Sequence, residues 1–173
     1  MMPIPWKYVE SWNCIACGIC CKGYQVVLGF NEWVNLIRTY GVGVTQPGIS
    51  NFHLGKKSDG TCVFLYKFFD NWLCGLQDTK PKACKLWPFK VLSGPKFGRP
   101  NEAVYKYGDK NFFVYVDPSC IGIRWGEPKP EFTYRTLTEL VEIATGLREK
   151  QYYSTSRISY RPQYFRVRGR KVI

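Results

Sequence analysis

Histidine is nearly absent from this sequence, since His53 is the only one in 173 residues. Catalytic zinc sites commonly use two or three histidines, and histidine is the commonest acid–base catalyst. The sequence also lacks a glycine-rich nucleotide-binding loop. These absences exclude the usual histidine-dependent and nucleotide-dependent enzymes, and His53 itself, in a stretch rich in Gly, Pro, Ser and Asn, is expected at the surface.

Long hydrophobic runs are also missing. No apolar stretch approaches the roughly 20 residues that a membrane-spanning helix needs. The segment 1–7 contains two prolines and no apolar stretch of signal-peptide length. We therefore expect a cytoplasmic protein with no membrane partner, and no motif indicates a small-molecule substrate.

Acidic residues are few, because 13 Asp and Glu face 25 Lys and Arg, for a net charge of +12. The excess is concentrated in two segments. Residues 80–110 contain eight basic residues against two acidic ones, and residues 150–173 contain seven against none. The rest of the chain is nearly neutral, so the segregated charge predicts a polyanionic partner.

The basic C-terminal segment is rich in arginine and interleaved with aromatic residues. Arginine binds phosphate through two parallel hydrogen bonds and stacks on bases, and Tyr and Phe offer further stacking faces. We expect RNA or a ribonucleoprotein, such as the ribosome, as the partner; a solvated tail without a partner is the alternative. The candidate RNA-contacting residues are Lys82, Lys85, Lys90, Arg157, Tyr160, Arg161, Tyr164, Phe165, Arg166, Arg168, Arg170 and Lys171.

Cysteine, in contrast, is abundant, and four of the eight cysteines fall within residues 14–21. Thiolates three residues apart can share one soft metal, and Gly18 can supply the positive φ of a tight loop. The spacing also matches the C-x2-C-x2-C run that holds iron–sulfur clusters. Because adjacent side chains tend to diverge, Cys20 and Cys21 are expected to serve two sites more easily than one tetrahedral ion.

Eight thiols allow two four-thiolate sites, or one cluster with spare thiols. Four disulfide bridges are the alternative, which suits small secreted chains better. We favour an iron–sulfur cluster of the 4Fe-4S type over zinc because of the triplet spacing. The candidate ligands are Cys14, Cys17, Cys20, Cys21, Cys62, Cys74, Cys84 and Cys120.

The pattern predicts an α+β fold: a small irregular single domain of short β-hairpins and about two helices, organised around a cysteine-ligated metal centre. We place this domain at residues 1–150 and a basic extension at 151–173. The expected elements are a strand over 24–30, a helix with its N-cap at Asn31 that ends at Gly41, a loop over 41–60, hairpins over 62–74 and 103–116, a short helical segment over 80–89, and a helix opened by the capping box Thr136–Glu139.

All eight cysteines, in this order and spacing, resemble the zinc- or iron-chelating family known for its CxxCxxCC motif. The matching positions are Cys14, Cys17, Gly18, Cys20 and Cys21, then Cys62-Val63-Phe64-Leu65, Cys74, Pro81, Cys84, Pro88-Phe89, Cys120 and Gly122. Lys80 departs from the family's arginine, and Ile121 departs from its proline. The resemblance implies metal chelation by the cysteines.

Some relatives in that family are labelled iron–sulfur oxidoreductases, and one branch resembles lysine methylases of flagellin. The resemblance therefore implies an alternative, an iron–sulfur redox or methyl-transfer enzyme. The missing catalytic motifs favour a structural metal instead.

Overall fold

Two separate groups of buried apolar side chains divide the chain into two compact units. Unit 1 comprises Met1–Ile15 and Lys85–Ile158, and unit 2 comprises Ala16–Cys84 and Ser159–Ile173. The computed structural model describes residues 2–77, 79–154, 165–167 and 170–172. Five α-helices and several short antiparallel sheets lie in this described part, so the α+β prediction is confirmed.

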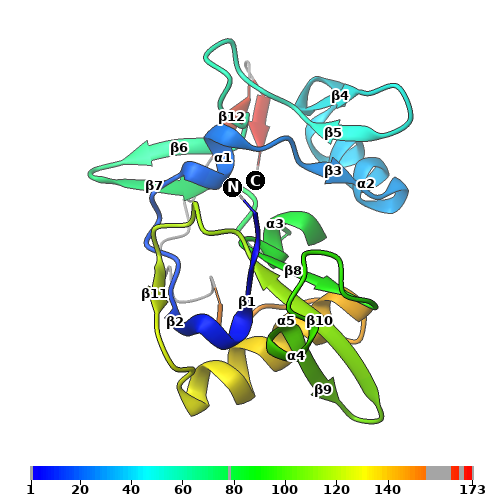
Figure 1. Ribbon diagram of the computed structural model, residues 1–173. Helices are drawn as coiled ribbons and strands as arrows, with labels where there is room; N and C mark the ends of the chain where they lie inside the picture. Colours follow the sequence, from blue (N-terminus) through cyan, green and yellow to red (C-terminus); the bar gives the residue numbers. More distant parts are fainter. Residues whose placement is uncertain (1, 78, 155–164, 168–169, 173) are drawn as a thin grey trace. The chain divides into compact units, whose positions relative to one another are not determined.

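The main sheet of unit 1 grows from a hairpin of β-branched and aromatic residues. Strands β9 and β10 meet at a turn where Gly108 has φ +58°, as the sequence predicts for 103–116. Strand β10 also pairs antiparallel with β8 and β1 (Figure 1). The four strands are β1 (Ile4–Pro5), β8 (Phe89–Leu92), β9 (Val104–Tyr107) and β10 (Lys110–Val116).

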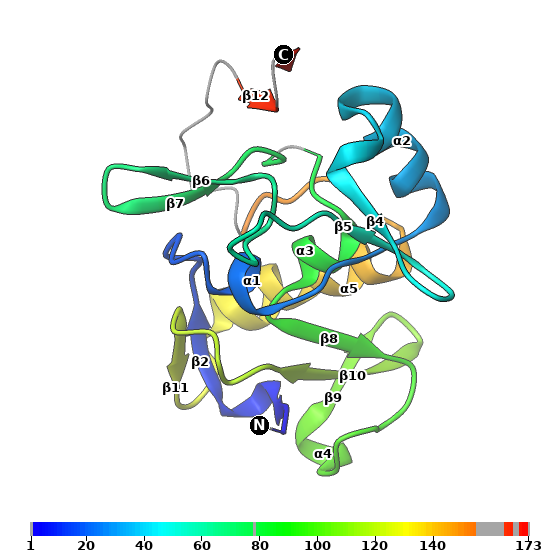
Figure 2. The same ribbon diagram turned by 90° about the horizontal axis from the view of Figure 1, so that it is seen from above.

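A second, two-stranded sheet and several helical segments complete unit 1. Helix α5 lies against β8 (Figure 2), and Leu137, Leu140 and Val141 are fully buried in the core that results. Burial of such side chains stabilises each by about 1.5–3 kcal/mol. The remaining elements are η1 (Trp6–Tyr8), β2 (Val9–Trp12), α4 (Pro100–Ala103), β11 (Ile123–Trp125), η3 (Phe132–Leu137) and α5 (Thr138–Thr145).

The predicted capping box at residues 136–139 is wrong. A π-helical segment, η3, already runs through Thr136, so no helix begins there. Thr136 is buried and Glu139 is completely buried, with its carboxylate bonded to the backbone of residues 152–154. The helix ends before Leu147, which follows the left-handed Gly146 and is 70 % exposed. Tertiary contacts therefore override the local capping signal.

The described part of unit 2 combines three short helices with three small sheets, one of which is the pair β12 and β13 near the C-terminus. In the sheet of order β3-β5-β4, β3 lies within the strand predicted over 24–30, whereas β4 and β5 lie in the predicted loop; His53 on β5 pairs with Val27 and Gln46. The third sheet is the predicted hairpin, β6–β7. The elements are α1 (Ile19–Gly23), β3 (Val27–Leu28), α2 (Phe30–Tyr40), η2 (Val42–Val44), β4 (Thr45–Pro47), β5 (Phe52–Leu54), β6 (Leu65–Phe68), β7 (Asn71–Cys74) and α3 (Lys82–Leu86).

Helix α2 ends where the sequence predicts but begins earlier. Gly41 terminates it with φ +85° and donates its N–H to the Ile37 carbonyl at 2.9 Å. The N-cap is Gly29, not Asn31, because the Glu32 carboxylate accepts the Gly29 N–H at 2.8 Å. The acidic residue in the first turn thus fixes the start of the helix.

The basic C-terminal segment is described in two short strands, β12 (Phe165–Val167) and β13 (Arg170–Val172), which pair antiparallel. The sequence predicts no element there. The expected boundary near residue 150 stays a prediction. In the described ranges no helix is both long and apolar enough to cross a membrane.

Candidate metal centre

The first cysteines lie on a tight loop that leads into helix α1. Ala16 and Gly18 both have left-handed backbone, with φ of +54° and +74°, as the sequence predicts for Gly18. The Gly18 carbonyl accepts the N–H groups of Cys21 and Lys22 at 3.0 and 3.1 Å, and Gly18 is the N-cap of α1. The turn therefore delivers Cys20 and Cys21 in the first helical turn.

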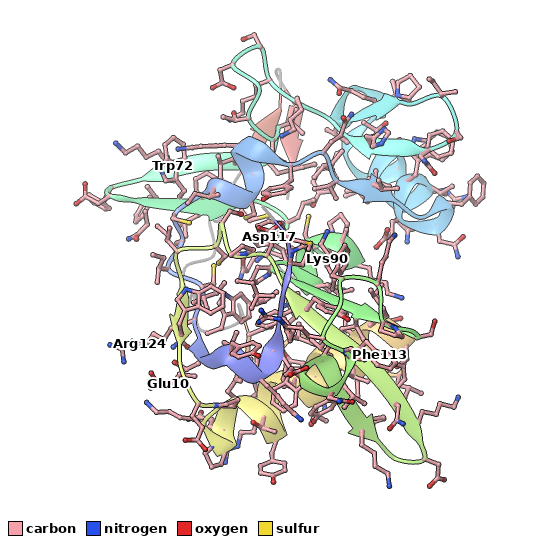
Figure 3. The ribbon with its side chains drawn as sticks, viewed as in Figure 1. Glu10, Trp72, Lys90, Phe113, Asp117 and Arg124 are labelled. Carbon is pink, nitrogen blue, oxygen red and sulfur yellow. The ribbon has the colours of Figure 1, made fainter. Side chains whose placement is uncertain are left out.

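The loop is held against strand β7 by Trp72, which Figure 3 labels. The Trp72 N–H donates to the Ala16 carbonyl at 2.9 Å, and Lys22 Nζ lies 4.1 Å from the centroid of the Trp72 ring. A Cβ added at Gly18 would come within 3.0 Å of the Trp72 side chain. Gly18 is thus required both by its φ and by this close approach.

Cys20 and Cys21 do not diverge as expected. Their Sγ atoms are 3.9 Å apart. A tetrahedron of sulfurs at about 2.3 Å from zinc has edges of about 3.8 Å. The two adjacent thiols can therefore occupy two corners of one tetrahedral site, and the geometric objection to a single ion disappears.

Two more thiols reach the same part of unit 2 from the β6–β7 hairpin. The register pairs Leu65 with Cys74 at the open end of the hairpin, and Cys62 lies three residues before Leu65. The Cys62 N–H donates to the Cys21 carbonyl at 2.8 Å. The hairpin predicted over 62–74 is therefore present, with β6 starting at Leu65 rather than Cys62, and both cysteines lie at its open end.

The electrostatics of these thiols show that they interact. Hydrogen bonds with the Cys21 thiol lower the pKa of Cys20 and the pKa of Cys62 to about 7 each, and the same bonds raise the pKa of Cys21. Burial raises the pKa of Cys74 to about 11 and holds the pKa of Cys84 well above its usual range. The negative charge of neighbouring thiolates adds to both increases. Five thiols therefore share one electrostatic environment.

Lys80 supplies a positive charge in this environment. It is only 9 % exposed, and its charge lowers the pKa of Cys20 after the larger effect of the Cys21 hydrogen bond. It also opposes the pKa increases of Cys74 and Cys84. Lys80 therefore favours the thiolate forms of these cysteines, and its burial is not revealed by the sequence alone.

Cys14 and Cys120 belong to unit 1 and pack against its core. Strands β2 and β11 pair Trp12 with Ile123, and the Asn13 N–H donates to the Gly122 carbonyl at 3.2 Å. This ladder places Cys14 and Cys120 at one end of the same sheet. Cys17 lies in unit 2, on the loop before α1.

These thiols suit a thiophilic metal chemically, and the 3.9 Å separation of the Cys20 and Cys21 Sγ atoms matches one edge of a tetrahedral sulfur site. Within the described ranges, however, no three His, Cys, Asp or Glu side chains surround a common point closely enough to hold an ion as they stand. No two of the eight cysteines, all of which lie in the described ranges, are joined by a disulfide, so the disulfide alternative finds no support. Closing a site would require thiol side chains to rotate inward, which metal binding commonly drives.

The candidate RNA-contacting residues fall into three groups. Lys82 and Lys90 are exposed, while Lys85 is half-buried and its Nζ donates to the Glu149 carbonyl at 2.8 Å. Phe165, Arg166, Arg170 and Lys171 lie on the β12–β13 hairpin. The remaining five, Arg157, Tyr160, Arg161, Tyr164 and Arg168, lie outside the described residues.

Sequence reasoning missed Glu32 as a supporting residue. Its carboxylate accepts the Gly29 N–H through Oε2 and the Lys82 N–H through Oε1, at 2.8 and 2.6 Å. It thereby joins the start of α2 to the start of α3, which carries Cys84. An acidic residue at the third position of a helix was the available signal, but only the fold shows its second partner.

The fold and its thiols define a cysteine-cluster protein, an α+β chain with convergent sulfur donors. A family model described as "CxxCxxCC: Putative zinc- or iron-chelating domain" matches residues 13–121, and the chain belongs to this family. The predicted resemblance is therefore confirmed. No curated protein and no solved structure matches the chain significantly.

Proposed function

We propose that this protein binds a structural zinc or iron ion through the thiols of unit 2. The ligands are drawn from Cys20, Cys21, Cys62, Cys74 and Cys84. The observation that carries the proposal is the convergence of thiols from α1, the β6–β7 hairpin and α3, with two sulfurs at 3.9 Å. When bound, the ion would cross-link these three segments.

Cys14, Cys17 and Cys120 complete the set of eight proposed ligands. A 4Fe-4S cluster remains the second candidate, because Cys14, Cys17 and Cys20 keep the triplet spacing of iron–sulfur ligands. The 3.9 Å separation of Cys20 and Cys21 supports a single tetrahedral ion instead.

Metal analysis of the intact chain, purified without oxygen, tests this proposal. About one or two equivalents of zinc or iron without sulfide would support mononuclear sites, whereas about four iron and four sulfide would establish the cluster. A metal-free protein with oxidised cysteines would refute metal binding altogether.

Separate variants at Cys20 and Cys84 distinguish a structural from a catalytic metal. If the metal is structural, Cys20→Ser and Cys84→Ser each lose metal and melt at lower temperature. A variant that melts like the intact chain, yet has lost a redox transition, would favour the oxidoreductase or methyl-transfer alternative.

We further propose that the basic segments bind RNA, in a ribonucleoprotein such as the ribosome. Exposed Lys82 and Lys90 and the arginine-rich C-terminal residues support this, since the described side chains leave both lysines at the surface. A full-length variant with Arg166, Arg168 and Arg170 changed to Gln should bind RNA more weakly and with a shallower salt dependence. Equal binding at matched salt would contradict the role of the C-terminal segment.

A further inference from the structure

Unit 1 contains an open cavity of about 700 Å³, formed by the N-terminal segment, the loop before α4 and the end of β11. Its chemically distinctive lining residues are Lys7, Tyr8, Phe97, Arg99, Trp125 and Glu127. All belong to unit 1, and none is a cysteine or a candidate RNA contact from the sequence. The volume is typical of sites for small organic ligands.

Three aromatic rings border this cavity. Tyr8 is 38 % exposed and Trp125 is 46 % exposed, so both present ring surface to solvent. Phe97 is fixed from behind by an edge-on contact with Tyr115, at 5.2 Å between ring centroids. Partly exposed rings on an ordered framework provide stacking surfaces for a planar ligand.

Cationic side chains lie over two of these rings, Tyr8 and Phe97. The guanidinium of Arg99 is 5.5 Å from the Tyr8 ring centroid, and Lys90 Nζ and Lys96 Nζ are 5.5 and 6.0 Å from the Phe97 centroid. Lys7 Nζ donates to the Asn101 carbonyl at 2.8 Å, which holds its charge in place. Glu127 is the acidic member of the lining, and its carboxylate can accept a hydrogen bond from a base amine.

The backbone around the cavity is irregular at three places. Arg99 has left-handed backbone, with φ 49° and ψ 57°, and Gly126 has φ +147°. The ladder between β11 and β2 shifts register between Arg124 and Trp125. Bulges re-aim side chains, and such strained conformations concentrate at binding sites.

Charged side chains lie beside this irregular part of the β2–β11 ladder. Lys129 forms an ion pair with Glu10 and lowers the pKa of the Glu10 carboxyl, and the charge of Arg124 on the facing strand lowers this pKa further. Figure 3 labels both Glu10 and Arg124. The Gly126 N–H donates to the Tyr8 carbonyl at 2.9 Å. This hydrogen bond joins Tyr8, the last residue of η1, to the chain that follows Trp125, the last residue of β11.

We propose that this cavity binds one nucleotide of a single-stranded RNA. The base would stack on Trp125 or Tyr8, and the phosphate would bind Arg99 and Lys7. An apolar ligand would make no ion pair with the cations, and a simple anion would not stack on the rings, whereas a nucleotide can do both. The proposal deepens the RNA-binding part of the proposed function by naming a base-contacting site separate from the C-terminal segment.

Binding of a fluorescein-labelled hexauridylate to the full-length, metal-loaded protein tests this proposal by fluorescence anisotropy. Arg99→Gly removes the cation and the strain of a non-glycine residue at positive φ, so this variant should fold at least as stably. Trp125→Ala removes the stacking surface. Each substitution should weaken binding by about tenfold or more.

Lys110→Gln is the matched control, because it removes one positive charge from the exposed end of β10 without touching the cavity. It should leave the dissociation constant within about twofold, because Lys110 does not line the cavity and its loss changes only the general charge of the protein. Competition with adenosine monophosphate and with inorganic phosphate separates nucleotide recognition from simple anion binding. Only the nucleotide should displace the labelled strand.

The variant in which Arg166, Arg168 and Arg170 are changed to Gln distinguishes this site from the C-terminal segment. If it alone weakens binding, while Arg99→Gly and Trp125→Ala bind like the intact chain, the cavity proposal is overturned and the role of the C-terminal segment stands. If Arg99→Gly and Trp125→Ala both lose affinity for the labelled strand while they melt at the temperature of the intact chain, the cavity proposal is supported. The proposal is overturned if inorganic phosphate competes as well as adenosine monophosphate does, or if neither the intact protein nor any variant binds the labelled strand.

Discussion

At the scale of single residues, Glu139 shows how one buried carboxylate can organise a chain segment. Its two oxygens accept the N–H groups of Tyr152, Tyr153 and Ser154 at 2.6 to 3.2 Å, and the Ser154 hydroxyl at 2.8 Å. Arg148 Nη1 lies 3.5 Å from the same carboxylate. Since the residue is completely buried, these donors compensate the loss of its hydration.

Replacement of this carboxylate should be strongly destabilising. Glu139→Ala leaves several buried donors without an acceptor, so we expect the free energy of unfolding to fall by about 3 kcal/mol. Urea unfolding followed by circular dichroism measures this loss. Glu131→Gln is the control, because the exposed Glu131 pairs with Arg135 at 3.9 Å and should change stability by less than about 0.5 kcal/mol. Equal losses in the two variants would contradict this account.

Gly122 is required by a close backbone approach rather than by its φ. A Cβ at this position would collide with the Asn13 carbonyl oxygen, at the end of the sheet where Cys14 and Cys120 lie. We expect Gly122→Ala to destabilise the protein by about 1–3 kcal/mol through this overlap. Thermal melting tests it against Gly94→Ala, where an added Cβ meets nothing within 4 Å. Indistinguishable melting temperatures would show that the backbone relaxes freely.

At the scale of elements, Glu32 couples two helices of unit 2. It caps α2 through Gly29 and accepts the N–H of Lys82, the first residue of α3. The carboxylate also lies at a helix N-terminus, where negative charge is favourable. The position of Cys84 on α3 thus depends on a residue more than 50 positions earlier in the chain.

Removal of this link should weaken both helices. We expect Glu32→Ala to lower the free energy of unfolding by about 1–2 kcal/mol, because one cap and one interhelical hydrogen bond disappear. Asn31→Ala is the discriminating control, since a local reading of the sequence makes Asn31 the cap. In the structure it is exposed and should cost less than about 0.5 kcal/mol. A larger loss of stability for Asn31→Ala than for Glu32→Ala would contradict this account and support Asn31 as the N-cap.

At the scale of the whole molecule, the two units have cores of different composition. The unit 1 core contains large side chains such as Trp6, Trp12 and Phe132. The unit 2 core includes Cys62, with Cys21 and Cys74 packed beside it. Metal binding to these thiols should therefore stabilise unit 2 directly, because the ligands are part of its core.

Chelation should accordingly act unevenly along the chain. After metal removal under reducing conditions, we expect amides of β6, β7 and α3 to exchange hydrogen faster, while amides of β8 and β10 keep their protection. Hydrogen exchange with mass spectrometry measures this. Addition of zinc should restore protection in unit 2. Uniform loss across both units would mean that the metal stabilises the molecule as one cooperative structure.

Local patterns correctly predicted several elements and the kind of site. The hairpins β6–β7 and β9–β10, the end of α2 at Gly41 and the positive φ of Gly18 all follow from short-range turn chemistry. The cysteine spacing likewise predicts the family, because thiols a few residues apart need only local backbone to converge. These features depend on residues within one turn or one hairpin.

What the sequence by itself determined is therefore the α+β class and the cysteine-rich family. Only the tertiary structure decided that Cys20 and Cys21 approach to 3.9 Å, that Lys80 is buried, and that Glu139 is an internal acceptor rather than a helix cap. It also decided the β3-β5-β4 sheet, in which β4 and β5 are strands that local propensity does not favour. The last three share one physical reason: each depends on partners distant in sequence, whose burial and hydrogen bonds outweigh local preference.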